Sequence, residues 1–206
     1  MADERRDDFG KIEWLDSERL VEGFFKVDKI KLRYSTYDGK MSPELSWYLL
    51  RRPDAVCAVV YNTDRDALYF VSQFRLGLAA KDDPAWTVEL TAGVVEEGES
   101  REEAIVREIR EELGFAVTHA EEVQKIYPSP AILSERIYLY YIEVTDDQRV
   151  SGGGGTDHEH EDLQISEVPL AELPDFIDKN DIIDSKTLIG LAWFMAVKAG
   201  SKKRKA

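Results

Sequence analysis

Gly93 to Phe115 reads GVVEEGESREEAIVREIREELGF. This stretch fits the pattern G-x5-E-x7-R-E-U-x-E-E-x-G-U, in which U is an aliphatic or aromatic residue, at every specified position. At average residue usage, such a match arises by chance on the order of once per billion start points. The matching residues are Gly93, Glu99, Arg107, Glu108, Ile109, Glu111, Glu112, Gly114 and Phe115.

Local signals place a helix inside this stretch. Ser100 followed by Glu103 is a capping box, so we expect the helix to begin at Arg101. Gly114 is a typical residue at which a helix ends. Gly93, before the helix, permits a close approach of the backbone.

The glutamates of this helix predict a metal site. Glu108, Glu111 and Glu112 stand at i, i+3 and i+4, so their carboxylates share one face and repel each other unless a cation lies among them. Carboxylate oxygens suit Mg2+ or Mn2+. Arg107 can pair with Glu99 or another carboxylate and hold the preceding loop. A Glu-rich helix is more often a solvated surface helix, but the glycines at both ends and the full spacing favour the metal site.

Composition limits the classes of protein to be considered. The chain has 206 residues, 43% of them hydrophobic, so we expect one domain with a substantial core and a small appendage. A net charge of −14 argues against nucleic acid as a partner, and a polyanionic substrate would need a divalent cation to mediate contact. The single cysteine, Cys57, stands in an apolar run typical of a buried strand. No signal peptide or membrane span is evident, so we expect a cytoplasmic protein.

The first fifty residues predict a small antiparallel β layer. Apolar and polar residues alternate over 20–37, which is the pattern of a half-buried strand. Asp38-Gly39 is a hairpin signal, and residues 45–50 can form the returning strand. These strands are too short to bury a core of their own.

The remainder of the chain predicts an α+β domain over 51–200, followed by a basic tail at 201–206. Gly152–Gly155 is expected to be a flexible loop. Alternating strands and helices imply a sandwich with a mixed sheet inside and helices on its outer faces. Strands are expected at 55–61, 67–74, 86–92, 117–127, 137–144 and 163–168, and two further helices at 170–178 and 186–199.

The pattern at 93–115 is the Nudix box, and the chain resembles the Nudix hydrolases, which use magnesium to cleave nucleoside diphosphates linked to another group. Over about residues 20–198 it is most similar to the branch that hydrolyses ADP-ribose and nucleoside diphosphate sugars. The glycine run resembles the GDP-mannose and UDP-glucose hydrolases more closely, whereas Ser134-Glu135-Arg136 resembles the ADP-ribose hydrolases, so the substrate stays open. The strings that carry the resemblance are Gln73-Phe74-Arg75, Ala92-Gly93, Ser129-Pro130, Ser134-Glu135-Arg136, Gly152–Gly155 and Glu159–Leu163.

This resemblance implies roles for residues at the reaction centre. Glu108, Glu112 and the carbonyl of Ala92 would hold the metal ions. Glu159 would act as the general base and Glu161 as a further metal ligand, although the two could exchange roles. Glu111 would assist the ligands or orient a water molecule, and Arg107 would support the acidic face. Without the resemblance, Glu159 and Glu161 would be read as solvated loop residues.

The resemblance also implies substrate contacts and a homodimer that pairs through the N-terminal layer. Two alternatives stay open: a nucleoside triphosphatase, and a Nudix-fold module that senses a nucleotide without cleaving it. The full set of metal glutamates favours an enzyme. Taken alone, Phe24 and Phe25 would be core residues and Arg52 a surface charge. The implied contacts are Arg52 and Arg75 at the diphosphate or sugar, Phe24 and Phe25 at the nucleobase, and Ser129 and Glu135 at the sugar.

Overall fold

The computed structural model describes residues 10–23, 25–156 and 162–199, with side chains up to Val197. The chain divides into two compact units. Unit 1 contains Met1–Arg52 and the separate segment Ser129–Glu135, and unit 2 contains Pro53–Pro128 and Arg136–Ala206. The basic tail expected at 201–206 lies outside the described residues.

Unit 1 contains a three-stranded antiparallel sheet in the order β1-β2-β3. Its strands are β1 (Ile12–Glu22), β2 (Lys26–Tyr34) and β3 (Leu45–Arg51). The segment Ser129–Glu135 extends this unit beside β3, because the Leu50 N–H donates to the Ile132 carbonyl (2.8 Å) and the Leu50 carbonyl accepts from the Ser134 N–H (3.0 Å). The expected N-terminal antiparallel layer is therefore confirmed.

The strand expected over 20–37 is wrong in its bounds. The chain turns between β1 and β2. The alternation of apolar and polar residues is interrupted there by the adjacent pairs Leu20-Val21 and Phe24-Phe25, and this interruption was the available sign of the turn. The part of β1 that precedes Leu20 was not expected as a strand. Nearly all its residues are exposed, and an exposed strand does not need the alternation that marks a buried face.

Unit 2 is built on a mixed seven-stranded sheet in the order β10-β5-β4-β9-β8, with β6 beside β5 and β7 beside β4. Strands β4 and β9 are parallel, and the other pairs are antiparallel. The strands are β4 (Ala55–Asn62), β5 (Ala67–Phe74), β6 (Trp86–Glu89), β7 (Thr91–Val94), β8 (Glu121–Ile126), β9 (Ile137–Val144) and β10 (Gln164–Pro169).

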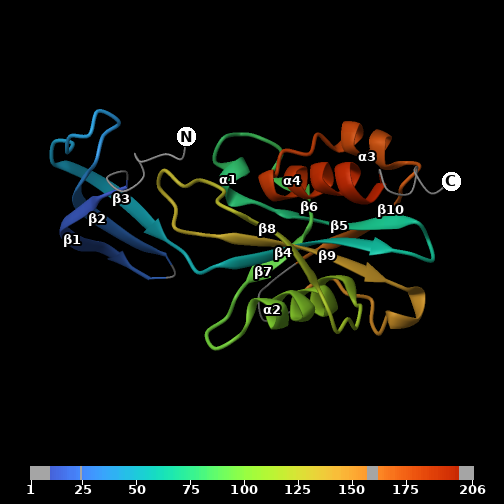
Figure 1. Ribbon diagram of the computed structural model, residues 1–206. Helices are drawn as coiled ribbons and strands as arrows, with labels where there is room; N and C mark the ends of the chain where they lie inside the picture. Colours follow the sequence, from blue (N-terminus) through green and yellow to red (C-terminus); the bar gives the residue numbers. More distant parts are fainter. Residues whose placement is uncertain (1–9, 24, 157–161, 200–206) are drawn as a thin grey trace, which may run out of the picture. The chain divides into compact units, whose positions relative to one another are not determined.

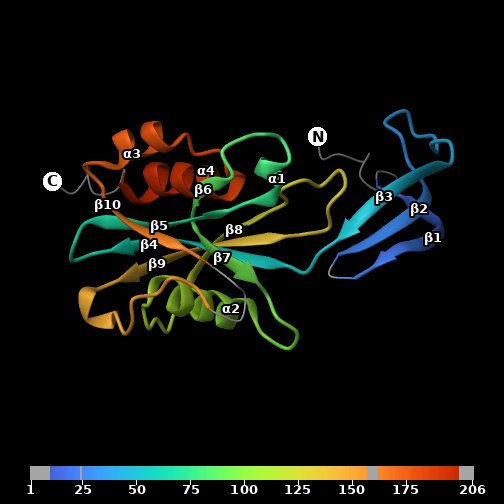
Figure 2. The same ribbon diagram turned by 180° about the vertical axis from the view of Figure 1, so that it is seen from behind.

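Helices cover both faces of this sheet, which confirms the expected α+β sandwich. Helix α2 (Arg101–Glu108), which continues as a π-helical turn over Ile109–Leu113, lies on one face (Figure 1). Helices α3 (Leu173–Asn180) and α4 (Ser185–Trp193) lie on the other face (Figure 2). The short helix α1 (Leu76–Ala79) was not expected. No helix in the described part of the chain is long and apolar enough to cross a membrane.

Strand β4 lies at the centre of the sheet and divides its side chains between two apolar cores. Val56, Ala58 and Val60 pack in the core under α2. Cys57 and Val59 pack in the core under α4. The predicted burial of Cys57 is confirmed, and burial raises the pKa of its thiol to about 12.

The strand expected over 86–92 is broken at Leu90, and this break positions the candidate site. Strand β6 pairs with β5, whereas β7 pairs with β4, so the chain changes neighbours between them. The Leu90 N–H leaves both ladders and donates to the Thr187 hydroxyl of α4 (2.9 Å). Strand β7 therefore starts a new ladder beside helix α2.

Candidate active site

Helix α2 begins and ends where the sequence predicts. The Ser100 hydroxyl accepts the Glu103 N–H (3.2 Å), and the Glu103 carboxylate accepts the Ser100 N–H (2.8 Å), so the capping box is complete. After Glu108 the helix widens into the π-helical turn, and Gly114 closes it in the left-handed conformation with φ +79°. Such turns are rare and often occur at functional sites.

Two of the three glutamates expected to form the metal site are buried against the sheet. Glu108 is 4% exposed and Glu112 is 0% exposed, whereas the side chain of Glu111 is about one-third exposed. Burying two carboxylates one helical turn apart costs free energy unless positive charge compensates it. This part of the helix is therefore suited to a cation.

Arg107 joins the acidic helix to the loop before it. Its guanidinium donates to Glu99 (3.0 Å), Glu108 (2.7 Å) and Glu111 (3.1 Å), and to the carbonyl of Val94 (3.1 Å). These contacts, with Glu99 first, raise the pKa of Arg107, and the same pair lowers the pKa of the Glu99 carboxyl. The pairing expected between Arg107 and Glu99 is present, and it fixes the loop to the helix.

Gly93 makes room for the Glu108 carboxylate. A Cβ atom at Gly93 would lie 1.7 Å from Glu108 Oε1 and 2.0 Å from its Cδ, so any other residue would collide with the carboxylate. The glycine is thus required by this close approach. Glu108 is held against the Ala92-Gly93 step of β7, whose Ala92 carbonyl is the backbone ligand that the resemblance implies.

The donor set fits a hard divalent cation. Mg2+ usually keeps several waters and is bound by one or two carboxylates together with substrate phosphates. Glu108, Glu112 and the Ala92 carbonyl supply oxygen donors of that kind. Within residues 10–23, 25–156 and 162–199, no three Asp, Glu, His or Cys side chains gather into a metal-binding cluster. Donors for a complete coordination shell would therefore come partly from outside these side chains.

A second buried charge cluster lies on β6, α4 and the end of β5, and the sequence analysis missed it. Glu89 is 2% exposed and accepts both the Nε–H (2.7 Å) and the Nη2–H (2.6 Å) of Arg75. The buried Lys186 ammonium also donates to Glu89 and lies 3.1 Å from Asp184. The available signal in the sequence was a charged residue, Glu89, between the apolar residues Val88 and Leu90.

The neighbouring opposite charges favour the ionised forms of Glu89 and Arg75. Burial alone would raise the pKa of Glu89, but Arg75 and Lys186 hold it below its ordinary value. Burial alone would lower the pKa of Arg75, but Glu89 first, and then Asp184 and Glu112, raise it. Of the two buried glutamates on the acidic helix, Glu112 is the one whose charge contributes to the raised pKa of Arg75.

Unit 1 brings together three of the expected substrate residues. The Arg52 guanidinium lies 5.3 Å from the centroid of the Phe25 ring, and its Nε lies 3.0 Å from Glu135 Oε1. Phe25 is 42% exposed, so reading it as a core residue is wrong. Ser129 is an exposed residue of the same unit, and its carbonyl accepts the Leu133 N–H (2.9 Å).

Three expected residues, Phe24, Glu159 and Glu161, lie outside the described residues, as do His158 and His160. The glycine run Gly152–Gly155, expected as a flexible loop, has no regular secondary structure and is hydrogen-bonded to the end of the acidic helix: the Gly154 N–H donates to the Glu112 carbonyl (2.8 Å).

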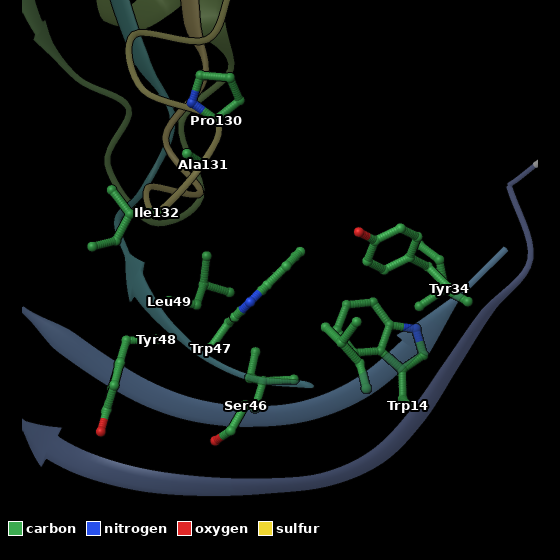
Figure 3. A pocket seen from close by; sticks show the side chains of 12 residues that line it. Trp14, Tyr34, Ser46, Trp47, Tyr48, Leu49, Pro130, Ala131 and Ile132 are labelled. Carbon is green, nitrogen blue, oxygen red and sulfur yellow. The ribbon is translucent and has the colours of Figure 1, made fainter. Parts of the chain in front are cut away.

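Unit 1 also contains an apolar pocket of about 750 Å3. Figure 3 shows the side chains around it, with aromatic residues from the three strands and a short run from the segment Ser129–Glu135. None of the charged candidate residues lines this pocket. Its labelled lining residues are Trp14, Tyr34, Ser46, Trp47, Tyr48, Leu49, Pro130, Ala131 and Ile132.

The chain is similar to known proteins over most of its length. The NUDIX domain family matches residues 51–188. The chain is 30% identical over 187 residues to an ADP-ribose pyrophosphatase of Escherichia coli, covering 90% of this chain and 89% of that protein. It is 31% identical over 185 residues to an ADP-ribose pyrophosphatase of Haemophilus influenzae, covering 88% and 85%.

The chain is also similar to a protein with a different named substrate and to a solved structure. A GDP-mannose pyrophosphatase of Enterobacter sp. is 28% identical over 184 residues, covering 89% of this chain and 94% of that protein. The crystal structure of an ADP compounds hydrolase has the same fold, with a TM-score of 0.69 at 21% identity, over 91% of this chain and 96% of that chain.

The Glu89 cluster predicts a pH-dependent stability. We expect Glu89→Gln to lower the free energy of unfolding by about 3 kcal/mol at neutral pH, because the buried Lys186 would lose Glu89 and keep Asp184 as its carboxylate partner, and Arg75 would lose its paired carboxylate. Since the pKa of Glu89 is lowered, this contribution is present above the ordinary glutamate pKa of about 4.3 and is lost as the pH falls through the lowered value. Urea unfolding should show the difference from wild type shrinking on acidification. The exposed control Glu44→Gln should change stability by less than about 0.5 kcal/mol, and a difference for Glu89→Gln that ignores pH would contradict the assignment.

The contact at Gly93 gives a second prediction. We expect Gly93→Ala to displace the Glu108 carboxylate, to lower stability by about 1–3 kcal/mol through overpacking, and to weaken Mn2+ binding measured by titration calorimetry. Gly77→Ala is the matched control, because a Cβ there would meet nothing within 4 Å. Wild-type Mn2+ binding in Gly93→Ala would show that Glu108 does not depend on this approach.

Proposed function

The chain belongs to the Nudix family, and we propose that it hydrolyses the diphosphate bond of ADP-ribose or of a nucleoside diphosphate sugar such as GDP-mannose or UDP-glucose. The products would be a nucleoside monophosphate and a sugar phosphate. The similar proteins named ADP-ribose pyrophosphatase and GDP-mannose pyrophosphatase support this substrate class. The observation that carries the proposal is the buried pair Glu108 and Glu112, one of them seated against Gly93.

Mg2+ is the proposed cofactor, with Mn2+ as a possible substitute. When bound, such an ion supplies neutralisation of the diphosphate charge and activation of water. Glu108, Glu112 and the Ala92 carbonyl are the proposed ligands, and Glu161 is a further one by resemblance. On a chain with a net charge of −14, a divalent cation also reduces the repulsion between protein and substrate.

The proposed reaction is a direct displacement by water. Glu159 accepts the proton of the attacking water as general base, and Glu111 orients that water. The water oxygen forms a bond to one phosphorus in line with the bridging oxygen, whose bond breaks and whose electron pair leaves with the other phosphate, so no covalent enzyme intermediate forms. Arg107 keeps Glu99, Glu108 and Glu111 in place during this change of charge.

Substrate contacts are proposed for both units. Arg75, held in one orientation by both oxygens of Glu89, is suited to bind the diphosphate or its sugar. Phe25 has an exposed ring that can stack on a nucleobase, and Arg52 lies over that ring while it pairs with Glu135. Ser129, Glu135 and Phe24 complete the proposed set.

A homodimer and a cytoplasmic location are part of the proposal. Unit 1 exposes large apolar side chains, among them Trp14 at 66%, Trp47 and Ile12, around the pocket in Figure 3. A surface of this kind marks an interaction site, and a second copy that covers the same surface would bury it. The single buried Cys57 is compatible with a reducing cytoplasm.

Product analysis tests the activity. We expect wild-type protein to release a nucleoside monophosphate from ADP-ribose, GDP-mannose or UDP-glucose only when Mg2+ or Mn2+ is present. Glu112→Gln should lower kcat by about 100-fold or more, because it removes a metal ligand, while binding of the intact nucleotide is largely kept. A protein that binds the nucleotide but cleaves none of the three would be a sensor instead, and release of pyrophosphate from nucleoside triphosphates alone would favour the triphosphatase.

The dimer is tested through Trp14. We expect light scattering to give the mass of two chains for wild type, and Trp14→Ser to weaken the pairing by about 2 kcal/mol, or roughly thirtyfold in Kd, because it truncates a central aromatic side chain. Tyr37→Ser is the matched control in the same unit, since Tyr37 is exposed and does not line the pocket. A stable and active wild-type monomer would contradict the proposed dimer.

A further inference from the structure

The end of the acidic helix is closed by a separate segment of the chain, Ser151–Gly155, which we name the glycine strap. The last carbonyls of a helix have no partner within the helix itself. Here the Gly154 N–H donates to the Glu112 carbonyl (2.8 Å), and the Gly155 N–H donates to the Glu111 carbonyl (3.2 Å). The strap therefore binds the backbone of Glu111 and Glu112, two of the four glutamates that the box specifies.

The approach of the strap is so close that side chains are excluded at specific positions. A Cβ atom at Gly153 would lie 2.3 Å from the Glu112 carbonyl oxygen and 2.8 Å from the carbonyl carbon of Leu113, and Gly153 has φ +69°. On the helix side, a Cβ at Gly114 would lie 2.3 Å from the Ser151 carbonyl oxygen. Gly152 differs, because a Cβ there would meet nothing within 4 Å and its φ lies outside the left-handed region.

Neighbouring residues hold the strap in place. The Val150 N–H donates to the Gly114 carbonyl (2.8 Å). The Arg149 guanidinium donates to the carbonyls of Ser151 and Gly152 (3.4 Å each) and lies 5.5 Å from the centroid of the Phe115 ring. The residues just before the strap therefore bind both the end of the helix, at Gly114, and the strap itself. All of these residues belong to unit 2.

The last turn of the acidic helix is π-helical, and the hydrogen bonds from the strap stabilise it. In a π-helix each N–H reaches one residue further back than in an α-helix, and such segments are short and rare. The turn over Ile109–Leu113 ends at Gly114, so the strap supplies the donors that its final carbonyls need. Glu112 projects from this turn, and the direction of its side chain depends on the backbone that the strap binds.

We propose that the glycine strap is a positioning element of the metal site, which fixes the backbone of Glu111 and Glu112 so that the Glu112 carboxylate is held ready for a divalent cation. Gly153 is the positioning residue at its centre. This inference rests on the proposed role of Glu112 as a metal ligand. Mg2+ demands near-ideal octahedral geometry, so a small displacement of one ligand is expected to affect binding of the ion.

The test compares Gly153→Ala with Gly152→Ala in the full chain. Mn2+ binding is measured by electron paramagnetic resonance of the free ion, at a temperature at which circular dichroism shows both variants folded. We expect Gly153→Ala to weaken Mn2+ binding by about 10–100-fold, as is typical when the support of a metal ligand is lost. Gly152→Ala should bind Mn2+ like wild type, because it adds a methyl group in open space.

Other outcomes separate this inference from the proposed function. A folded Gly153→Ala that binds Mn2+ like wild type overturns the inference, because the strap would then serve only stability. If Gly153→Ala does not fold, Arg149→Ala decides instead: it loosens the strap without adding a side chain at the helix end, and unchanged Mn2+ binding overturns the inference. Glu112→Gln is the remaining arm. Equal Mn2+ binding by Glu112→Gln and wild type would remove the metal-ligand role itself, and the positioning role of the strap with it.

Discussion

Burial of the Glu108 and Glu112 carboxylates on one helix is the constraint on which the rest of the site depends. Two negative charges beside an apolar core are unfavourable unless the surrounding structure compensates them. Gly93 gives Glu108 its space, Arg107 supplies positive charge from the same helix, and the glycine strap binds the backbone from which Glu112 projects. All three features act on the same helical turn, the one that carries Glu108 and Glu112. That convergence indicates a function for the turn beyond stability.

Local chemistry let the sequence predict the central part of this arrangement. The capping box at Ser100, the helix end at Gly114 and the spacing of the glutamates all depend on neighbours within a few residues, so pattern and structure agree. Strand β1, the break at Leu90 and the role of the glycine run could not be predicted in the same way. The break at Leu90 and the role of the glycine run depend on distant segments, namely the Thr187 hydroxyl of α4 and the end of the acidic helix. Strand β1 pairs with the neighbouring strand β2, but nearly all its residues are exposed, so it has no buried face to mark it in the sequence.

The charge cluster around Glu89 could not be predicted from the sequence either, because its members come from distant segments of the chain. Arg75 was singled out through its resemblance to a family motif, but nothing near it in sequence showed what orients it. Its partner Glu89 follows on the next strand, and Lys186 comes from a helix near the end of the chain. A buried carboxylate shared by two cations holds the Arg75 guanidinium in one orientation, whereas a solvated arginine, although equally charged, would be free to reorient. In the proposed function, the orientation of the arginine that binds the diphosphate is therefore set by residues that do not touch the substrate.

Unit 1 is assembled from two stretches that are far apart in the chain, since Ser129–Glu135 adds to the edge of β3. During synthesis the ribosome releases the three N-terminal strands long before that segment emerges. The nascent sheet must therefore wait with one edge and its aromatic side chains uncovered, which is the condition under which edge strands pair wrongly. About half of unit 2, including the acidic helix, is translated within that interval. The order of translation thus makes completion of the N-terminal layer a late event, coupled to the progress of the domain that follows it.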